Sequence, residues 1–341
     1  MMKEGDHLIQ YANALRALAI MAVVMIHVVA SLIAGDISKT WWLANIIESF
    51  ARWSVPVFVM VSGALLLGKD EPLSVFLKKR ASKIIIPFLF WILFYELLKV
   101  RTDIDMFSLK TAIVNIYTDK TFYHLWFLYM IVGIYLITPI FRPIAQNNKL
   151  LIYFIIVWLL LRVENLIFYF TSMHTGFKLG MFLGFTGYFL LGYLLAKHTL
   201  SKKVTAFIYI GGVVGLLITI FGTYFSTASK GVLDIYWYDY LSLNTILVSA
   251  AIFVLFKQNF NFNVRLVNSF AAASFGIYLI HPFFLVFYKS RIFQDLFGFA
   301  LHSKTIHVLF GVPVTFVVVT LSSYLAVLIL QKIPIVNKIV P

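Results

Sequence analysis

Two ionisable residues, Arg16 and His27, fall within the first long apolar stretch of the chain, where a charged side chain is costly unless it is paired or hydrated. They are eleven residues apart, so a helix would complete about three turns between them and leave both within roughly 20° of one face, about 16 Å apart. Alone, each is best interpreted as a snorkelling arginine or a hydrogen-bonded core histidine. As a pair, they predict a functional site along one cavity.

The second apolar stretch carries Glu48 and Arg52, one helical turn apart on one face. If this stretch runs antiparallel to the first, Glu48 reaches about the height of His27. A carboxylate beside an imidazole can fix its tautomer and stabilise its protonated form, which suits a general base. An ion pair between Glu48 and Arg52, which would only make the helix tolerable in lipid, is an equal alternative.

Three further groups of polar residues accompany these two helices. The basic run from Lys78 to Lys83, which includes Arg80, either anchors a helix at anionic headgroups or holds the phosphates of a soluble donor. His124 and Trp126 fall at the predicted start of the fourth helix, where an interfacial aromatic belt is the favoured interpretation. Tyr278 and His281 fall within the ninth helix, with His281 expected to face protein and Pro282 expected to kink the helix.

The composition assigns the chain to the membrane. Of its 341 residues, 61% are hydrophobic and 12% are charged, whereas soluble domains carry about 25% charged residues. The net charge of +14 is attributed to loops that remain cytoplasmic rather than to nucleic-acid binding. There is no cysteine, which excludes disulfides, thiol catalysis and thiolate metal sites, and the eight histidines are scattered, so no metal site is expected.

We therefore predict an all-α polytopic membrane protein with about ten transmembrane helices in one domain, residues 8–330. More Lys and Arg fall on the side of the N-terminus, so both termini are expected to be cytoplasmic. The small-residue spacing of Gly211 and Gly215 predicts a close contact between helices. The predicted spans are 8–34, 44–67, 84–99, 123–141, 150–171, 177–196, 206–226, 241–257, 271–288 and 308–330.

Five segments, in this order, resemble the acyltransferase-3 family of bacterial membrane acyltransferases, and the resemblance covers nearly the whole chain. One departure is Lys83, which stands where the family's cytoplasmic Arg-x-x-Arg motif has its second arginine; lysine keeps the charge but loses bidentate phosphate geometry. The segments are Leu15 through His27, Val55 through Gly63 with Ser62, Arg80 through Lys83 with Pro87 and Trp91, His124 through Leu128, and Ile277 through Pro282.

The resemblance implies a ten-helix enzyme of the bacterial cytoplasmic membrane without a bound cofactor. Such an enzyme takes an acyl group, commonly acetyl, from cytoplasmic acyl-CoA and passes it to a hydroxyl of a cell-surface polysaccharide or lipid-linked sugar. It also implies that His27 and Arg16 are the essential pair and that Arg80 and Lys83 lie near the donor. The supporting or acceptor-side candidates are Arg52, Ser62, His124, Trp126, Tyr278 and His281.

The expected mechanism has His27, oriented by Glu48, deprotonate the acceptor hydroxyl, or become acylated transiently. Two alternatives remain. A transporter or flippase of a polysaccharide intermediate would depend more on Arg16 than on His27. A different membrane acyltransferase fold would pair its buried histidine with a distant Asn or Asp. Expected partners are acyl-CoA, the sugar acceptor and membrane lipids, with no nucleic acid; a homo-oligomer is left open.

Overall fold

The computed structural model describes residues 4–100, 108–172, 184–260, 263–304 and 307–341, and these residues form helices without a strand. The prediction of an all-α polytopic membrane protein is confirmed. The helices, in chain order, are α1 (Glu4–Ile33), α2 (Lys39–Ala51), α3 (Ser54–Leu66), α4 (Leu73–Lys99), α5 (Leu109–Tyr117), α6 (Trp126–Gln146), α7 (Asn148–Thr171), α9 (Thr186–Lys197), α10 (Lys202–Lys230), η2 (Tyr236–Tyr238), α11 (Leu243–Asn259), α12 (Arg265–Lys289), α13 (Arg291–Phe297), α14 (Val308–Leu330) and η3 (Val336–Lys338).

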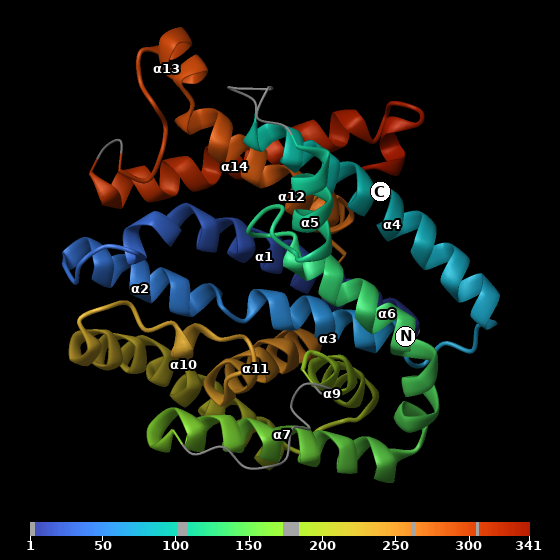
Figure 1. Ribbon diagram of the computed structural model, residues 1–341. Helices are drawn as coiled ribbons and strands as arrows, with labels where there is room; N and C mark the ends of the chain where they lie inside the picture. The colour runs from blue at the N-terminus through green and yellow to red at the C-terminus, as the bar shows by residue number, and fades with distance from the viewer. Residues whose placement is uncertain (1–3, 101–107, 173–183, 261–262, 305–306) are drawn as a thin grey trace.

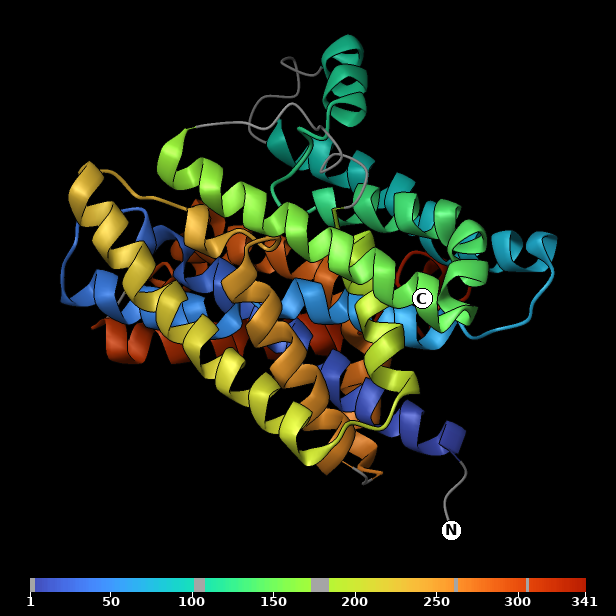
Figure 2. The same cartoon turned by 90° about the horizontal axis from the view of Figure 1, so that it is seen from below.

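Nine helical segments in the described part of the chain are long and apolar enough to cross a membrane. The predicted span 177–196 falls partly outside the described residues, and its described part is the twelve-residue helix α9. Figures 1 and 2 both place the start of α1 and the last residues of the chain toward the same end of the bundle. This arrangement agrees with two termini on one side of a membrane.

Where the span 44–67 is predicted, the structure has one segment long and apolar enough to cross a membrane, Lys39–Leu66, but the helix is interrupted within it. The structure divides it into α2 and α3, which meet at Arg52 and Trp53. Pro56 explains the break, because proline has no N–H to donate to the carbonyl of Arg52 and its ring disfavours a regular helix through that turn. α3 therefore starts afresh at Ser54, with Pro56 tolerated in its first turn.

The basic run from Lys78 to Lys83 is part of helix α4, so the predicted span 84–99 is too short. α4 begins at Leu73, directly after Pro72. Lysine and arginine are good helix formers, and residues 73–86 contain neither glycine nor proline. The helix therefore extends three turns before its apolar part, and its basic residues are held at fixed positions.

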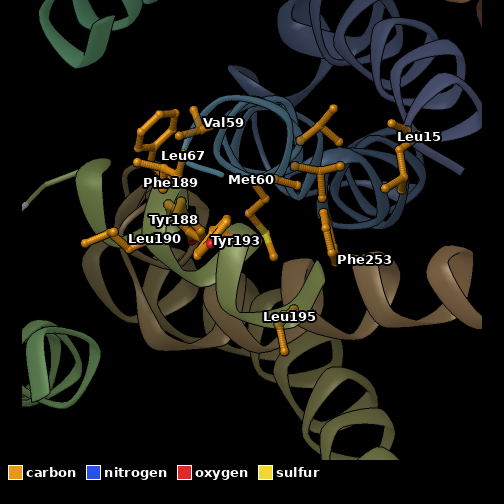
Figure 3. Packing of buried hydrophobic residues seen from close by; sticks show 14 of the residues in the cluster. Leu15, Val59, Met60, Leu67, Tyr188, Phe189, Leu190, Tyr193, Leu195 and Phe253 are labelled. Carbon is orange, nitrogen blue, oxygen red and sulfur yellow. The ribbon is translucent and has the colours of Figure 1, made fainter. Parts of the chain in front are cut away.

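Helix α1 lies at the centre of the bundle, where it contacts α2, α3, α12 and α14 (Figure 1). Its two halves belong to two hydrophobic cores. Leu15 joins the core that also contains Met60 of α3 and Phe253 of α11 (Figure 3). Val24 joins the core shared with α12 and α14. Residues of α1 between Arg16 and His27 are thus fixed from several sides.

Glycines set the closest helix contacts. A Cβ on Gly63 of α3 would lie 1.8 Å from the carbonyl oxygen of Phe189, and one on Gly192 of α9 would lie 2.1 Å from that of Met60. The predicted close contact at Gly215 is also confirmed, since a Cβ there would lie 2.6 Å from the carbonyl oxygen of Asn244. α3 and α9, and likewise α10 and α11, therefore pack backbone to backbone.

Candidate active site

A cavity of about 300 Å³ opens between α1, α3, α4, α6 and α12. Its charged lining residues are Arg16, Arg80 and Lys83, and no Asp or Glu of the described residues lines it. We refer to it as the basic cavity. The structure thus brings together the three cations that the sequence singled out for donor binding, in a chamber suited to a phosphate-bearing molecule.

Aromatic side chains beside the basic cavity hold Arg80 by cation–π contacts. The Arg80 guanidinium lies 5.6 Å from the ring centroid of Phe76 and 5.9 Å from that of Tyr135. Lys83 is exposed, one turn further along α4. Ser62 also lines the cavity, but its hydroxyl donates to the carbonyl oxygen of Phe58 at 2.9 Å, within its own helix.

Arg142 of α6 is a basic residue beside this cavity that sequence reasoning missed. Its guanidinium lies 4.8 Å from the ring centroid of Phe76, so Arg80 and Arg142 share one buried ring. Arg142 also donates to the backbone carbonyl of Glu71 at 2.9 Å. In the sequence it reads as an ordinary basic residue near the end of a span, and only the packing of α6 against α4 reveals its place.

The Glu71 carboxylate balances part of this positive charge. It accepts a hydrogen bond from Lys79, and Arg142 lies 3.9 Å away. The Lys79 ammonium, aided by the charges of Arg80 and Arg142, holds the pKa of the Glu71 carboxyl below its ordinary value. Glu71 therefore ties the segment before α4 to α6 as an anion at the edge of the basic cluster.

A second cavity, of about 20 Å³, lies next to the first. Its polar lining residues are His27, His124, Trp126, Tyr240 and Tyr278. We refer to it as the histidine cavity. Five elements of the chain converge here, so none of the short motifs alone defines it.

His27 is paired with His281. Its Nδ1 atom lies 2.8 Å from Nε2 of His281, and the two rings are stacked with centroids 5.0 Å apart. The Nδ1 of His281 lies 3.0 Å from the carbonyl oxygen of Ile277, and a carbonyl can only accept a hydrogen bond. In the neutral pair His281 is therefore protonated at Nδ1 and accepts at Nε2 from Nδ1–H of His27. The lone pair at Nε2 of His27 is left as the basic position.

Of the two interpretations of Glu48, the structure contains the ion pair with Arg52, and the imidazole partner of His27 is His281. Glu48 is buried, but its ion-pair partner is Arg52, one turn along the chain. The same face of α2 packs toward α10, where Asn45 donates to the carbonyl of Ile220 at 3.0 Å. Because α12 packs directly against α1, His281 occupies the place that the sequence assigned to Glu48.

Arg52 has a further contact that bears on the site. Its guanidinium lies 4.6 Å from the ring centroid of Tyr238 and 5.4 Å from that of Tyr240. Tyr240 lines the histidine cavity and stacks on Trp126 with centroids 5.6 Å apart. The Glu48–Arg52 pair therefore supports one wall of the histidine cavity through Tyr240.

The aromatic-belt interpretation of His124 is also corrected. His124 is 1% exposed, and its ring centroid lies 5.7 Å from that of His281. The Tyr278 hydroxyl donates to the His124 backbone carbonyl, which ties α12 to the start of α6. His281 is fully buried, as the sequence predicted. Only Tyr123, half exposed and edge-on to the His27 ring at 4.9 Å, keeps an interfacial character.

A helical membrane bundle with a basic cavity beside a histidine cavity defines the class as a multi-pass membrane protein with a site suited to group transfer. A family model described as an acyltransferase domain matches residues 9–331. The chain therefore belongs to the acyltransferase-3 family and is a membrane acyltransferase. No curated protein and no solved structure matches it.

Proposed function

We propose that this protein transfers an acetyl group from acetyl-CoA to a hydroxyl of a cell-surface polysaccharide or lipid-linked sugar, in the bacterial cytoplasmic membrane. One observation carries the proposal: the basic cavity and the histidine cavity share the lining residues Val23, Val55, Phe127 and Tyr278. A donor whose phosphates lie among the cations can therefore have its thioester end next to His27.

The basic cavity supplies donor binding in this proposal. Arg80 and Lys83 on α4 bind the phosphates of acyl-CoA, and Arg16 on α1 lies deeper, toward His27. Placing the basic end of α4 in the cytoplasm puts the open side of this cavity where acyl-CoA is available. The acceptor then approaches the histidine cavity, beside Trp126 and Tyr240.

His27 supplies the chemistry. Its Nε2 takes the proton of the acceptor hydroxyl as the oxygen attacks the thioester carbonyl. The C–O bond of the new ester forms, the C–S bond breaks, and the CoA thiolate takes the proton back from His27. General-base help of this kind is worth about 10²–10⁴-fold in rate. If His27 is acylated transiently, the same Nε2 attacks the carbonyl, so both routes use one atom.

His281 acts as a positioning residue. By accepting a hydrogen bond from Nδ1 of His27 it fixes the tautomer and the ring orientation. No resident metal is required for exchange of a thioester for an ester, and the described residues contain no His, Asp or Glu cluster that could hold one.

The proposal is tested by following radiolabelled acetyl from acetyl-CoA into a cell-envelope extract. Protein in detergent should move the label into a base-labile ester, and the Arg16→Ala variant should do so only at much higher acetyl-CoA concentration. An exposed-arginine variant, Arg291→Ala on α13, is the matched control. Absence of both transfer and free CoA, with labelled glycan moved across a vesicle membrane instead, would replace this proposal by the transporter alternative.

A further inference from the structure

Four side chains form the whole of the wall that the two cavities have in common. They come from four different helices, α1, α3, α6 and α12, and they are Val23, Val55, Phe127 and Tyr278. On one side of them is a chamber of about 300 Å³, and on the other a chamber of about 20 Å³. An acyl group that moves from the basic cavity toward His27 must therefore fit between these four side chains.

This wall is held in place by its neighbours. Val23, Val55 and Tyr278 are 4%, 7% and 7% exposed, respectively. The Tyr278 ring packs edge-on against Phe127 with centroids 5.3 Å apart, and its hydroxyl donates to the backbone carbonyl of His124. Side chains packed in this way cannot swing aside without disturbing two cores.

The small chamber sets a size limit. A cavity needs about 10–15 Å³ on this measure to hold one water molecule, so about 20 Å³ has room for a methyl-sized group and little more. With the thioester carbonyl at His27, an acetyl methyl fits beside the imidazole. Each further methylene would have to displace Val23, Val55 or Phe127.

We infer that Val23, Val55, Phe127 and Tyr278 are an acyl-length filter that makes the enzyme selective for acetyl over longer acyl groups. This inference rests on the proposed function and names the size class of its acyl donor. An apolar wall discriminates one added methylene by about 10- to 200-fold. The native enzyme should therefore lose at least about tenfold in kcat/KM between acetyl-CoA and propionyl-CoA, and more with butyryl-CoA.

The test compares valine truncations on the same helices. Val23→Ala and Val55→Ala enlarge the small chamber, whereas Val24→Ala and Val57→Ala remove the same atoms from fully buried positions that line neither cavity. The measurement is kcat/KM for free-CoA release from acetyl-, propionyl- and butyryl-CoA, with envelope extract as acceptor. Two variants on different helices keep the test decisive if one fails to fold.

The expected result is a butyryl-to-acetyl ratio raised about tenfold or more in Val23→Ala or Val55→Ala and unchanged from native in Val24→Ala and Val57→Ala. The inference is overturned if the native enzyme uses butyryl-CoA as well as acetyl-CoA, or if lining and control variants change the ratio equally. Both of those results still require CoA release and so leave the proposed function standing. Absence of release from every acyl-CoA overturns the proposed function and the filter together.

Discussion

Nδ1 of His27 lies 2.8 Å from Nε2 of His281, although 254 residues separate them in the chain. This contact, with the carbonyl of Ile277 behind His281, assigns the proton in the neutral pair and leaves Nε2 of His27 with a free lone pair, the position that the proposed mechanism uses as base. The candidate site thus contains a hydrogen-bonded pair of imidazoles on α1 and α12, and Glu48 pairs with Arg52 instead of with His27. The proposed chemistry depends on this orientation of His27.

Replacing His281 tests its positioning role. His281→Ala removes the acceptor for Nδ1–H of His27, and a lost hydrogen bond of about 1 kcal/mol corresponds to roughly a fivefold to tenfold loss of kcat with little change in KM. His281→Gln places an amide oxygen near the lost Nε2 and should recover part of the rate. A purely structural role would make both variants equally poor, with a lowered thermal midpoint in each.

Donor binding depends on the cations of α4. Arg80→Ala should raise the KM for acetyl-CoA by about 10- to 100-fold, because hydrogen bonds to charged groups contribute about 1.5–3 kcal/mol. We expect kcat to be nearly unchanged, because Arg80 lines the basic cavity but not the histidine cavity. Lys83→Arg should lower KM, because a guanidinium restores bidentate phosphate contact. Initial-rate kinetics measure both, with Arg291→Ala as control. A fall in kcat without a change in KM would contradict this role.

The backbone contact between α3 and α9 makes Gly63 intolerant of any side chain. Gly63→Ala would place Cβ 1.8 Å from the carbonyl oxygen of Phe189, so the helices must separate, at a cost of about 1–3 kcal/mol or more. Gly133→Ala on α6 has nothing within 4 Å of its Cβ and should not lower stability. Thermal unfolding in detergent compares the two variants. Equal midpoints would show that α3 and α9 are not packed as described.

The Glu71 carboxylate should make stability depend on pH. Its folded pKa is lowered by Lys79, Arg80 and Arg142. The contribution of the ionised Glu71 carboxylate to the free energy of unfolding is therefore full above the unfolded pKa of about 4.3. It is lost as pH falls through the lower pKa of the folded state. Glu71→Gln should lower the thermal midpoint at pH 7, and the difference from native should shrink below about pH 4. Asp70→Asn, at an exposed neighbouring position, is the control; a pH-independent difference for Glu71→Gln would contradict the ion pairing.

The helices were largely predictable because a continuous apolar run of about 20 residues is long enough to cross the bilayer as a helix, which satisfies its own backbone hydrogen bonds. Two details differ for local reasons: Pro56 interrupts the helix within the second span, and the basic residues of α4 extend the third span. The neighbour that Glu48 faces could not be deduced from the sequence. Helical periodicity shows which residues share a face of α2, but it does not determine how the helix is rotated about its own axis. In the structure Glu48 pairs with Arg52 on its own helix, and Asn45, one turn earlier, donates to the carbonyl of Ile220 on α10.

The candidate site was only half predictable. Arg16, Arg80 and Lys83 each stand out as charges in or next to apolar sequence, and the structure places them around one cavity. Arg142 and Tyr240 carry no such signal, since one reads as a loop cation and the other as an interfacial tyrosine. The contact between His27 and His281 depends on the register of α1 against α12, which no local pattern encodes.

The most direct measurement is free-CoA release from acetyl-CoA by the purified native protein, by His27→Ala and by His7→Ala, with envelope extract as acceptor. His7 is on the same helix but lines neither cavity, so it controls for loss of an imidazole from α1. We predict native and His7→Ala rates within a factor of about two and a His27→Ala rate lower by about 10²–10⁴-fold. Release by His27→Ala at the native rate would contradict it.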